Sequence, residues 1–187
     1  MHKTNLDKTG MEEEAKEFAR EAHKEQFRKY KNEAYIEHPI RVAALVKTVA
    51  HTQEMLCAAY LHDVVEDTGV TLEEIEKRFG RKVAGLVEEL TDEFIKENYR
   101  HLNRSKRKEK EVERQSKISR EAKTVKLADV IDNTRDIVEN DRDFARRYVP
   151  EMEALVEALQ GGDFKLFMKA CYEVENGKKI LKQDRSS

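Results

Sequence analysis

The stretch AAYLHDVVEDT, residues 58–68, decides how the rest of the chain is interpreted. It starts with an apolar helical pattern, reaches His62 and Asp63, and one turn later reaches Glu66 and Asp67. Like charges one turn apart on a helix repel each other, so a tip that holds three carboxylates is unfavourable unless something neutralises it. A divalent cation would offset the repulsion and organise the cluster.

The helical spacing of these four residues suits such a cation. Neighbouring residues on a helix point about 100° apart, so a metal off the helix edge can be held by both His62 and Asp63. Glu66 lies four residues past His62, and Asp67 lies four past Asp63, so each pair shares a face. The tip therefore offers two ligands, with two further carboxylates just behind them.

Two residues elsewhere are suited to complete the site. His38 precedes Pro39, which favours an extended backbone at the start of a helix. Asp129 stands in an apolar helical stretch, where an unpaired carboxylate would be expensive to bury. A mixture of histidine and aspartate suits a first-row metal such as Mn, Fe, Co or Zn better than Ca.

Each piece also has a plainer interpretation. His38 alone could be a surface or capping histidine, Asp129 alone a structural buried aspartate, and Glu66 with Asp67 a solvated helix end. The order H…HD…D in a helical chain favours the metal site.

The rest of the sequence predicts an all-α protein. The chain has only two prolines and seven glycines, and Val/Ile/Thr alternation over strand lengths is essentially missing. One apolar stripe is expected near the N-terminus, made of Ala15, Phe18, Ala19, Ala22 and Phe27. Helices are expected over 40–50 and, with Thr52 as N-cap, over 53–67 without a break. Another is expected from a capping box at 71–74 to a stop near Gly80, followed by one over 81–91. Later helices are expected over 123–140 and over about 149–159 and 164–181, on either side of Gly161 and Gly162.

Bulk composition narrows the protein class. A chain of 187 residues is enough for one domain with a sizeable core, and charged residues make up 40% of it. The formal net charge is only −2, so no whole-protein field calls for nucleic acid as a partner. Cys57 and Cys171 form no metal-type pair and are expected to be buried, reduced thiols. The polar N-terminus shows no secretory signal and no apolar run approaches the ~18 residues of a membrane span, so we expect a soluble cytoplasmic protein.

Residues 100–120 differ from the rest, because they are rich in Lys and Arg and poor in apolar residues. They predict either a mobile loop or a solvated helix. Two functions are open for this stretch. It is a charged surface connection, or it is a basic flap that uses Arg104, Lys106 and Arg107 to close over an anionic ligand.

Three segments together resemble a known family. The segments YIEHPIRVAALV, CAAYLHDVVEDTGVTLEEIEKRFGRKVAGLVEELTDE and KTVKLADVIDNTRDIV resemble the HD superfamily of metal-dependent phosphohydrolases. Within it they are most similar to the hydrolase domain of RelA/SpoT proteins and to stand-alone small alarmone hydrolases. The resemblance covers roughly residues 15–138, and LHDVVEDTGVTLEEIEKRFG is quite specific to that branch.

The resemblance implies a fold and an activity. It implies an all-α bundle with a metal in its centre. We predict that residues 1–187 form a single HD hydrolase domain, with a core of about 12–140 and C-terminal helices of about 141–182. The family hydrolyses the 3′-pyrophosphate of guanosine tetra- or pentaphosphate, releases pyrophosphate and typically uses manganese. The implied metal ligands are His38, His62, Asp63 and Asp129. Glu66 and Asp67 would position and activate water, while Arg28, Lys29 and Asn133 would bind the nucleotide.

Two positions depart from the family pattern. Many alarmone hydrolases have a basic residue after KLAD, and an aromatic residue or histidine before the Asn, where this chain has Val130 and Asp132. Asp132 adds negative charge near an anionic nucleotide unless it faces away or pairs with a base such as Arg135. These departures leave the metal ligands intact, but the identity of the substrate stays undecided. An HD phosphohydrolase that acts on another nucleotide, or on a phosphorylated cofactor such as NADPH, is one alternative, and a non-catalytic nucleotide-binding module is a second.

Overall fold

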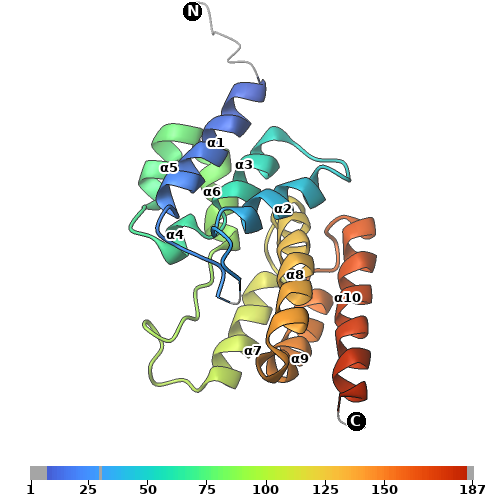
Figure 1. Ribbon diagram of the computed structural model, residues 1–187. Helices are drawn as coiled ribbons and strands as arrows, with labels where there is room; N and C mark the ends of the chain where they lie inside the picture. Colours follow the sequence, from blue (N-terminus) through green and yellow to red (C-terminus); the bar gives the residue numbers. More distant parts are fainter. Residues whose placement is uncertain (1–7, 30, 185–187) are drawn as a thin grey trace, which may run out of the picture. The chain divides into compact units, whose positions relative to one another are not determined.

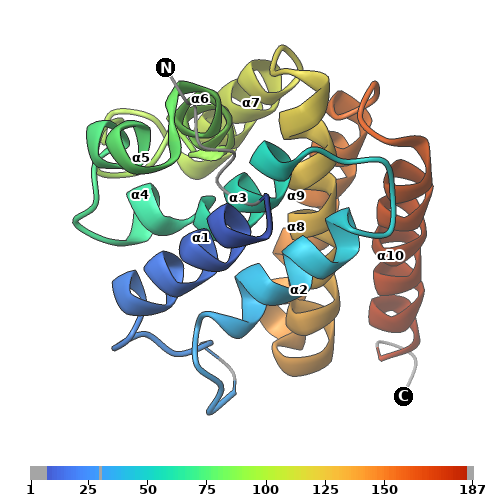
Figure 2. The ribbon, with the colours of Figure 1, turned by 90° about the horizontal axis from the view of Figure 1, so that it is seen from above.

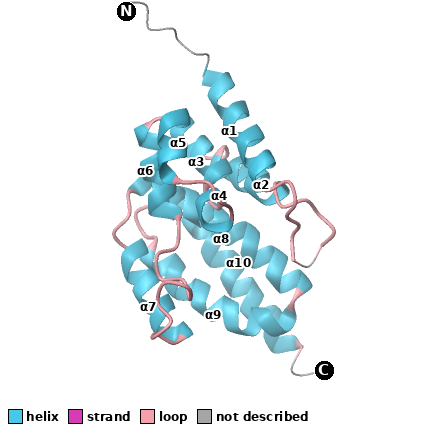
Figure 3. Ribbon diagram, turned by 90° about the vertical axis from the view of Figure 1, so that its left-hand side faces the viewer, coloured by secondary structure: helices cyan, strands magenta, loops and turns pink. Residues whose placement is uncertain are grey.

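The computed structural model describes residues 8–29 and 31–184, and within them it shows helices and no strand (Figure 3). The predicted all-α fold class is therefore confirmed. The helices form two compact units, the first ending at Thr91 and the second beginning at Asp92. The prediction that residues 1–187 form a single domain stays a prediction.

The helices of the first unit are α1 (Lys8–Ala22), α2 (Glu37–Val46), α3 (Gln53–Leu61), α4 (Val64–Asp67), α5 (Leu72–Phe79) and α6 (Arg81–Leu90). Those of the second are α7 (Arg104–Gln115), α8 (Arg120–Asn140), α9 (Arg142–Ala158) and α10 (Phe164–Gln183).

Helix α3 forms the centre of the first unit, where it packs against α1, α2 and α6 (Figure 2). Every residue from Met55 to Leu61 is buried, as expected for a helix that is covered on all sides. The Thr52 hydroxyl accepts a hydrogen bond from the Met55 N–H at 3.3 Å, so the predicted N-cap is confirmed. This central position buries the residues that lead into His62.

The helix does not continue through His62 and Asp63, so the prediction of one unbroken helix was wrong. Helix α3 ends at Leu61, and α4 begins at Val64. The Asp63 backbone has φ −97° and ψ −7°, away from ideal α-helical values, so the chain turns there. The Asp67 N–H still donates to the Asp63 carbonyl at 2.9 Å, which keeps these two residues one turn apart.

Two further boundaries in this unit differ from prediction. Ala15 and Ala19 are fully buried on α1, but Phe27 lies beyond the end of that helix and is 60% exposed. Helix α2 begins at Glu37 instead of residue 40 and ends at Val46 instead of residue 50. Pro39 is tolerated because the N–H groups of a first helical turn have no acceptor within the helix.

The capping box was predicted correctly. The Thr71 hydroxyl accepts from the Glu74 N–H at 3.3 Å, and the Glu74 carboxylate accepts from the Thr71 N–H at 2.8 Å. Helix α5 then stops at Gly80, whose φ of +86° is a conformation that other residues rarely adopt. Helix α6 follows directly, as expected for residues 81–91.

Helix α8 forms the centre of the second unit, where it packs against α9 and α10 (Figure 1). Gly162 permits a close approach, because a Cβ there would lie 2.9 Å from the Leu127 side chain. Helix α9 begins at Arg142 instead of about residue 149, and Pro150 lies inside it. The Asp141 carboxylate caps this helix by accepting from the Phe144 N–H at 2.9 Å, so the early start has its own support.

Residues 104–115 of the basic stretch form helix α7, which the Asn103 side chain caps through the Lys106 N–H at 2.9 Å. Arg104 makes two hydrogen bonds to the Glu151 carboxylate, at 2.8 and 2.6 Å, and Lys106 pairs with Glu109 at 2.7 Å. The mobile-loop alternative is therefore wrong for this segment. These ion pairs favour the surface-helix interpretation over the flap.

The two cysteines differ in exposure. Both are free thiols; Cys57 is fully buried, and Cys171 is only partly so, which confirms the prediction of burial for the first alone. Burial, with the nearby Glu12 carboxylate, raises the pKa of Cys57 to about 12. Within the described residues, no helix has the length and apolar character needed to cross a membrane.

Candidate functional site

Two buried histidines face each other in the first unit. His38 comes from the first turn of α2 and His62 from the turn after α3, and their exposed fractions are 0% and 1%. Their ring centroids lie 5.2 Å apart, and a ring nitrogen of each lies within 4.8 Å of the other. Two imidazoles at this spacing can bind one ion together.

The backbone fixes which nitrogen of His62 faces the site. Its Nδ1 lies 2.9 Å from the Ala59 carbonyl oxygen. A carbonyl can only accept, so Nδ1 carries the hydrogen and Nε2 presents a lone pair. Orientation of a ring by a backbone carbonyl is the usual arrangement for a metal-binding histidine.

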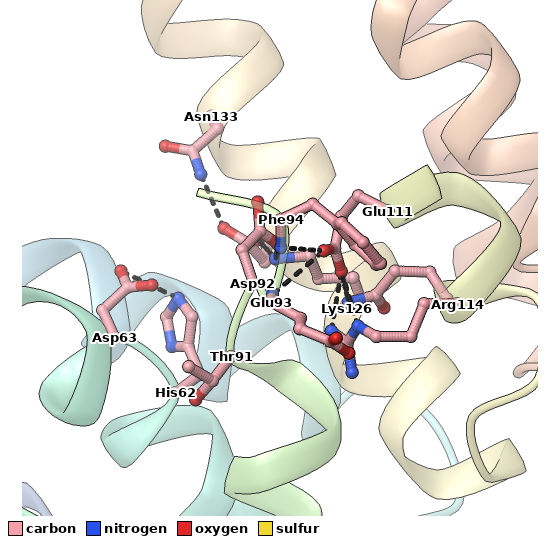
Figure 4. A network of polar contacts seen from close by, with 12 residues as sticks. His62, Asp63, Thr91, Asp92, Glu93, Phe94, Glu111, Arg114, Lys126 and Asn133 are labelled. Carbon is pink, nitrogen blue, oxygen red and sulfur yellow. Dashed lines mark hydrogen bonds and ion pairs between the residues drawn. The ribbon is translucent and has the colours of Figure 1, made fainter. Parts of the chain in front are cut away.

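Asp63 brings a carboxylate oxygen to both rings. Its Oδ2 atom lies 3.1 Å from His62 Nε2 and 3.6 Å from His38 Nε2 (Figure 4 shows the first pair). A carboxylate oxygen and a nitrogen lone pair repel each other unless a proton or a cation lies between them. The donor set of two imidazole nitrogens and one carboxylate therefore fits a first-row divalent metal.

The two further carboxylates of the tip belong to exposed residues. Glu66 and Asp67 both belong to α4. Packing around Asp67, and then the negative charge of Asp63, raise the pKa of the Asp67 carboxyl above its usual value, while a hydrogen bond from Tyr35 opposes this rise. A carboxylate with a raised pKa is better suited to accept a proton from water near neutral pH.

Tyr35 is a residue of this site that the sequence analysis missed. Its hydroxyl donates to Asp63 Oδ2 at 2.7 Å and lies 3.0 Å from Asp67 Oδ2. Burial, together with these two carboxylates, raises the pKa of Tyr35 far above its ordinary value, so the hydroxyl keeps its proton and acts as a donor. The available signal was its place three residues before His38, one turn from a proposed ligand.

The predicted basic pair lies in the loop between α1 and α2. The Arg28 guanidinium carbon lies 5.8 Å from the centre of the Tyr35 ring, and Lys29 is exposed. The loop is closed by the Arg28 N–H, which donates to the Glu33 carbonyl at 2.9 Å. Arg28 is thus brought to the same aromatic ring that contacts Asp63 and Asp67.

The second unit contains Asp129, which is 6% exposed on α8. The Asn133 amide donates to it at 2.6 Å, and the Lys126 ammonium lies 3.2 Å away (Figure 4). The expectation that a buried Asp129 has polar partners is confirmed, as is the expectation that Asn133 shares its face. Lys126 was not singled out from the sequence, although it begins the KLAD motif.

Asp129, Lys126, Asp92 and Lys108 form a series of ion pairs in which negative and positive charges alternate. Lys126 lies 3.9 Å from Asp92, which in turn accepts from the Lys108 ammonium at 3.1 Å. Burial would raise the pKa of Asp92, but the positive charges of Lys126 and Lys108 outweigh it and hold that pKa below its ordinary value. The carboxylates of Asp92 and Asp129 are therefore stabilised by ammonium groups inside this unit.

Glu111 holds the start of the preceding loop. This buried carboxylate accepts from the backbone N–H groups of Glu93 and Phe94 at 3.0 and 3.1 Å (Figure 4). It also accepts from the Arg114 side chain at 2.8 Å. These bonds fix the backbone next to Asp92.

A cavity of about 140 Å³ opens among these groups in the second unit. Its polar wall carries the Lys108 and Lys126 ammonium groups, the Asp129 carboxylate and the Asn133 amide, and its apolar wall is formed by side chains of α7, α8 and α9. It is lined by Asp92, Lys108, Glu111, Val112, Gln115, Lys126, Asp129, Val130, Asn133, Tyr148, Glu151, Met152 and Leu155. A site with an apolar wall and a few convergent polar groups is typical of a small-molecule pocket.

The two residues that depart from the family pattern, Val130 and Asp132, both lie on α8. Val130 lines this cavity, and Asp132 is buried on α8. Arg135, the base considered as a partner for Asp132, instead forms an ion pair with Glu173. Of the predicted site residues, the structure thus groups His38, His62, Asp63, Asp67 and Arg28 in the first unit, and Asp129 with Asn133 in the second.

Comparisons with known proteins agree on one family. The family model described as "HD domain" matches residues 15–155. The guanosine-3′,5′-bis(diphosphate) 3′-pyrophosphohydrolase MESH1 of Drosophila melanogaster is 40% identical over 130 residues, which cover 68% of this chain and 69% of that protein. The protein of the same name from Homo sapiens is 43% identical over 127 residues, covering 66% and 68%. A solved structure, described as a metazoan orthologue of SpoT that hydrolyses ppGpp, has a TM-score of 0.77 and 32% identity, and covers 93% of this chain and 95% of its own.

Proposed function

The chain belongs to the HD domain family, and from that membership we propose that it is a metal-dependent hydrolase of guanosine 3′,5′-bis(diphosphate) that releases pyrophosphate from the 3′ position. The similarity to the two MESH1 proteins carries this proposal, because it extends over two thirds of the chain and is matched by the fold of the SpoT orthologue. The facing histidines with Asp63 support it independently.

We propose that His38, His62, Asp63 and Asp129 hold one divalent ion, and that this ion is Mn²⁺. The lone pair of His62 Nε2 and the nearby Asp63 oxygen support the first three assignments. The order H…HD…D supports Asp129, whose carboxylate forms an ion pair with Lys126 at 3.2 Å. A bound ion of this kind lowers the pKa of a water molecule that it binds.

The carboxylates of α4 then have a chemical task. Asp67 would accept a proton from the attacking water, which fits its raised pKa, and Glu66 would hold that water in place. Arg28 and Lys29 would neutralise substrate phosphates, and the Arg28 plane could also stack on a base. Asn133 would contact the nucleoside.

A nucleotide panel tests the proposal. The purified full chain with Mn²⁺ is incubated with guanosine tetraphosphate, guanosine pentaphosphate, NADPH and simple nucleoside monophosphates, and the products are separated by ion-exchange chromatography. Pyrophosphate released from the tetraphosphate is the expected result. Inorganic phosphate from NADPH or a monophosphate, with the tetraphosphate intact, would favour the alternative substrate, and an unchanged panel with measurable nucleotide binding would favour a non-catalytic module.

The cytoplasmic location predicted from the sequence remains part of the proposal. Cell fractionation with an antibody to the chain tests it.

A further inference from the structure

The Tyr35 hydroxyl lies between the two carboxylates to which the proposal gives different tasks. It is 2.7 Å from Asp63 Oδ2 and 3.0 Å from Asp67 Oδ2. A phenol has one proton to donate, so the two carboxylates share one donor, and the shorter bond goes to Asp63. The side chain therefore couples the position of a proposed metal ligand to that of a proposed proton acceptor.

The Tyr35 ring is itself held by a buried histidine. The His23 ring stacks on it with a centroid distance of 4.5 Å and an interplanar angle of 29°, and His23 is 2% exposed. Ring stacking adds to the energy of burial and restricts rotation of the Tyr35 ring. The Tyr35 ring therefore presents its hydroxyl in a fixed direction.

Gln26 connects the same histidine to Asp67. Its Nε2 donates to the Asp67 carbonyl oxygen at 2.8 Å, and its Oε1 lies 2.7 Å from His23 Nδ1. Because the amide nitrogen must donate to the carbonyl, the amide oxygen accepts, and Nδ1 of His23 carries the hydrogen. The Asp67 carboxylate thus contacts Tyr35 directly, and the Asp67 backbone carbonyl is connected to His23 through Gln26.

We propose that Tyr35 is a positioning residue for this reaction, which holds the Asp63 and Asp67 carboxylates in a fixed mutual arrangement through its shared hydroxyl. The inference rests on the proposed function of this site and deepens it. Loss of a group that orients a metal ligand typically costs 10–100-fold in metal affinity or activity. Tyr35 acts through the two carboxylates and is not itself assigned to substrate.

The test is the Tyr35→Phe variant, which removes the hydroxyl and keeps the ring that stacks on His23. The matched control is Tyr60→Phe, because Tyr60 is also a buried tyrosine whose hydroxyl donates to a carboxylate, that of Glu12 at 3.1 Å, and neither residue has a role in the proposed reaction. We expect kcat of Tyr35→Phe to fall about 10–100-fold with KM within about twofold of wild type. A kcat equal to that of the Tyr60→Phe control would overturn the inference.

A double-mutant cycle separates positioning from general weakening. If Tyr35 acts through Asp67, adding Tyr35→Phe to Asp67→Asn costs much less than adding it to wild type. The same fold loss in both backgrounds would show that Tyr35 works independently of Asp67 and would refute the proposal.

Binding of Mn²⁺ gives a readout that needs no substrate. Calorimetric titration of the metal-free proteins should give a higher Kd for Tyr35→Phe than for wild type, and an unchanged Kd for Tyr60→Phe. Equal Kd values in all three proteins would refute the link to Asp63. If the wild type binds Mn²⁺ but hydrolyses nothing in the nucleotide panel, the proposed reaction is refuted. The comparison of Kd values would still test whether Tyr35 positions the Asp63 carboxylate.

Discussion

Replacing Lys126 by Met should destabilise the metal-free protein. The Lys126 side chain is 12% exposed, and its ammonium lies 3.2 Å from Asp129 and 3.9 Å from Asp92. Methionine keeps an unbranched apolar stem of similar length, so the main loss is the charge. Two mostly buried carboxylates are then left without their common cation.

The size of the effect follows from the partners that remain. Breaking a buried ion pair typically costs about 3–5 kcal/mol. Asp92 keeps Lys108 at 3.1 Å and Asp129 keeps the Asn133 amide at 2.6 Å, so the lower end applies. For a chain of this size, ~3 kcal/mol corresponds to a fall in Tm of about 6–12 °C.

The assay is thermal unfolding followed by calorimetry, with EDTA and then with saturating Mn²⁺. The control is Lys106→Met, because Lys106 pairs with Glu109 at the exposed surface, where an ion pair contributes little. In EDTA, Lys126→Met should melt well below both other proteins. With Mn²⁺ its Tm should rise more than that of wild type, because the ion replaces a positive charge beside Asp129. Coincident melting of the three proteins in EDTA, or equal shifts with Mn²⁺, would refute this reasoning.

Three other predictions concern single carboxylates. Asp63→Ala should abolish hydrolysis, and EDTA should lower the Tm of wild type more than that of the variant; equal sensitivity to EDTA would count against Asp63 as a ligand. Glu66→Gln and Asp67→Asn should keep stoichiometric Mn²⁺ but lose about 10²–10⁴-fold in kcat, and loss of the metal from either would show that its role is wrong. The lowered pKa of Asp92 means that its charge stabilises the fold above the ordinary aspartate pKa of about 3.9, and that this stabilisation is lost as the pH falls below that value towards the folded-state pKa. In urea unfolding, Asp92→Asn should therefore have a lower free energy of unfolding than wild type at pH 7, and this difference should disappear below about pH 4. A difference that does not change with pH would show that the charge of Asp92 is not its cause.

Local signals in the sequence predicted several elements well. The Thr71 capping box and the Thr52 N-cap each involve residues only three positions apart, so their hydrogen bonds follow from short-range geometry. Helical spacing also placed Asn133 beside Asp129, because four residues separate them on one helix. Such contacts depend little on how distant segments pack.

Contacts between distant segments were missed. Tyr35 lies 28 residues before Asp63, and Lys108 lies 16 residues after Asp92, and no helical period connects either pair. The turn at Asp63 was missed for a related reason. Nothing in the apolar pattern marks it, because Val64 is buried like the residues of α3 before it.

The two groups of carboxylates are stabilised in different ways, and this difference bears on the opening stretch of sequence. In the second unit, Asp92 and Asp129 are paired with ammonium groups. In the first unit, the contacts of Asp63 include a phenol and two imidazole rings, and the contact of Asp67 with Tyr35 is also to a phenol. A phenol donates a hydrogen bond but brings no positive charge, so those contacts direct the carboxylates without cancelling their repulsion. The fold thus orients the Asp63 and Asp67 carboxylates through the Tyr35 hydroxyl, and the proposed metal ion would add positive charge beside Asp63.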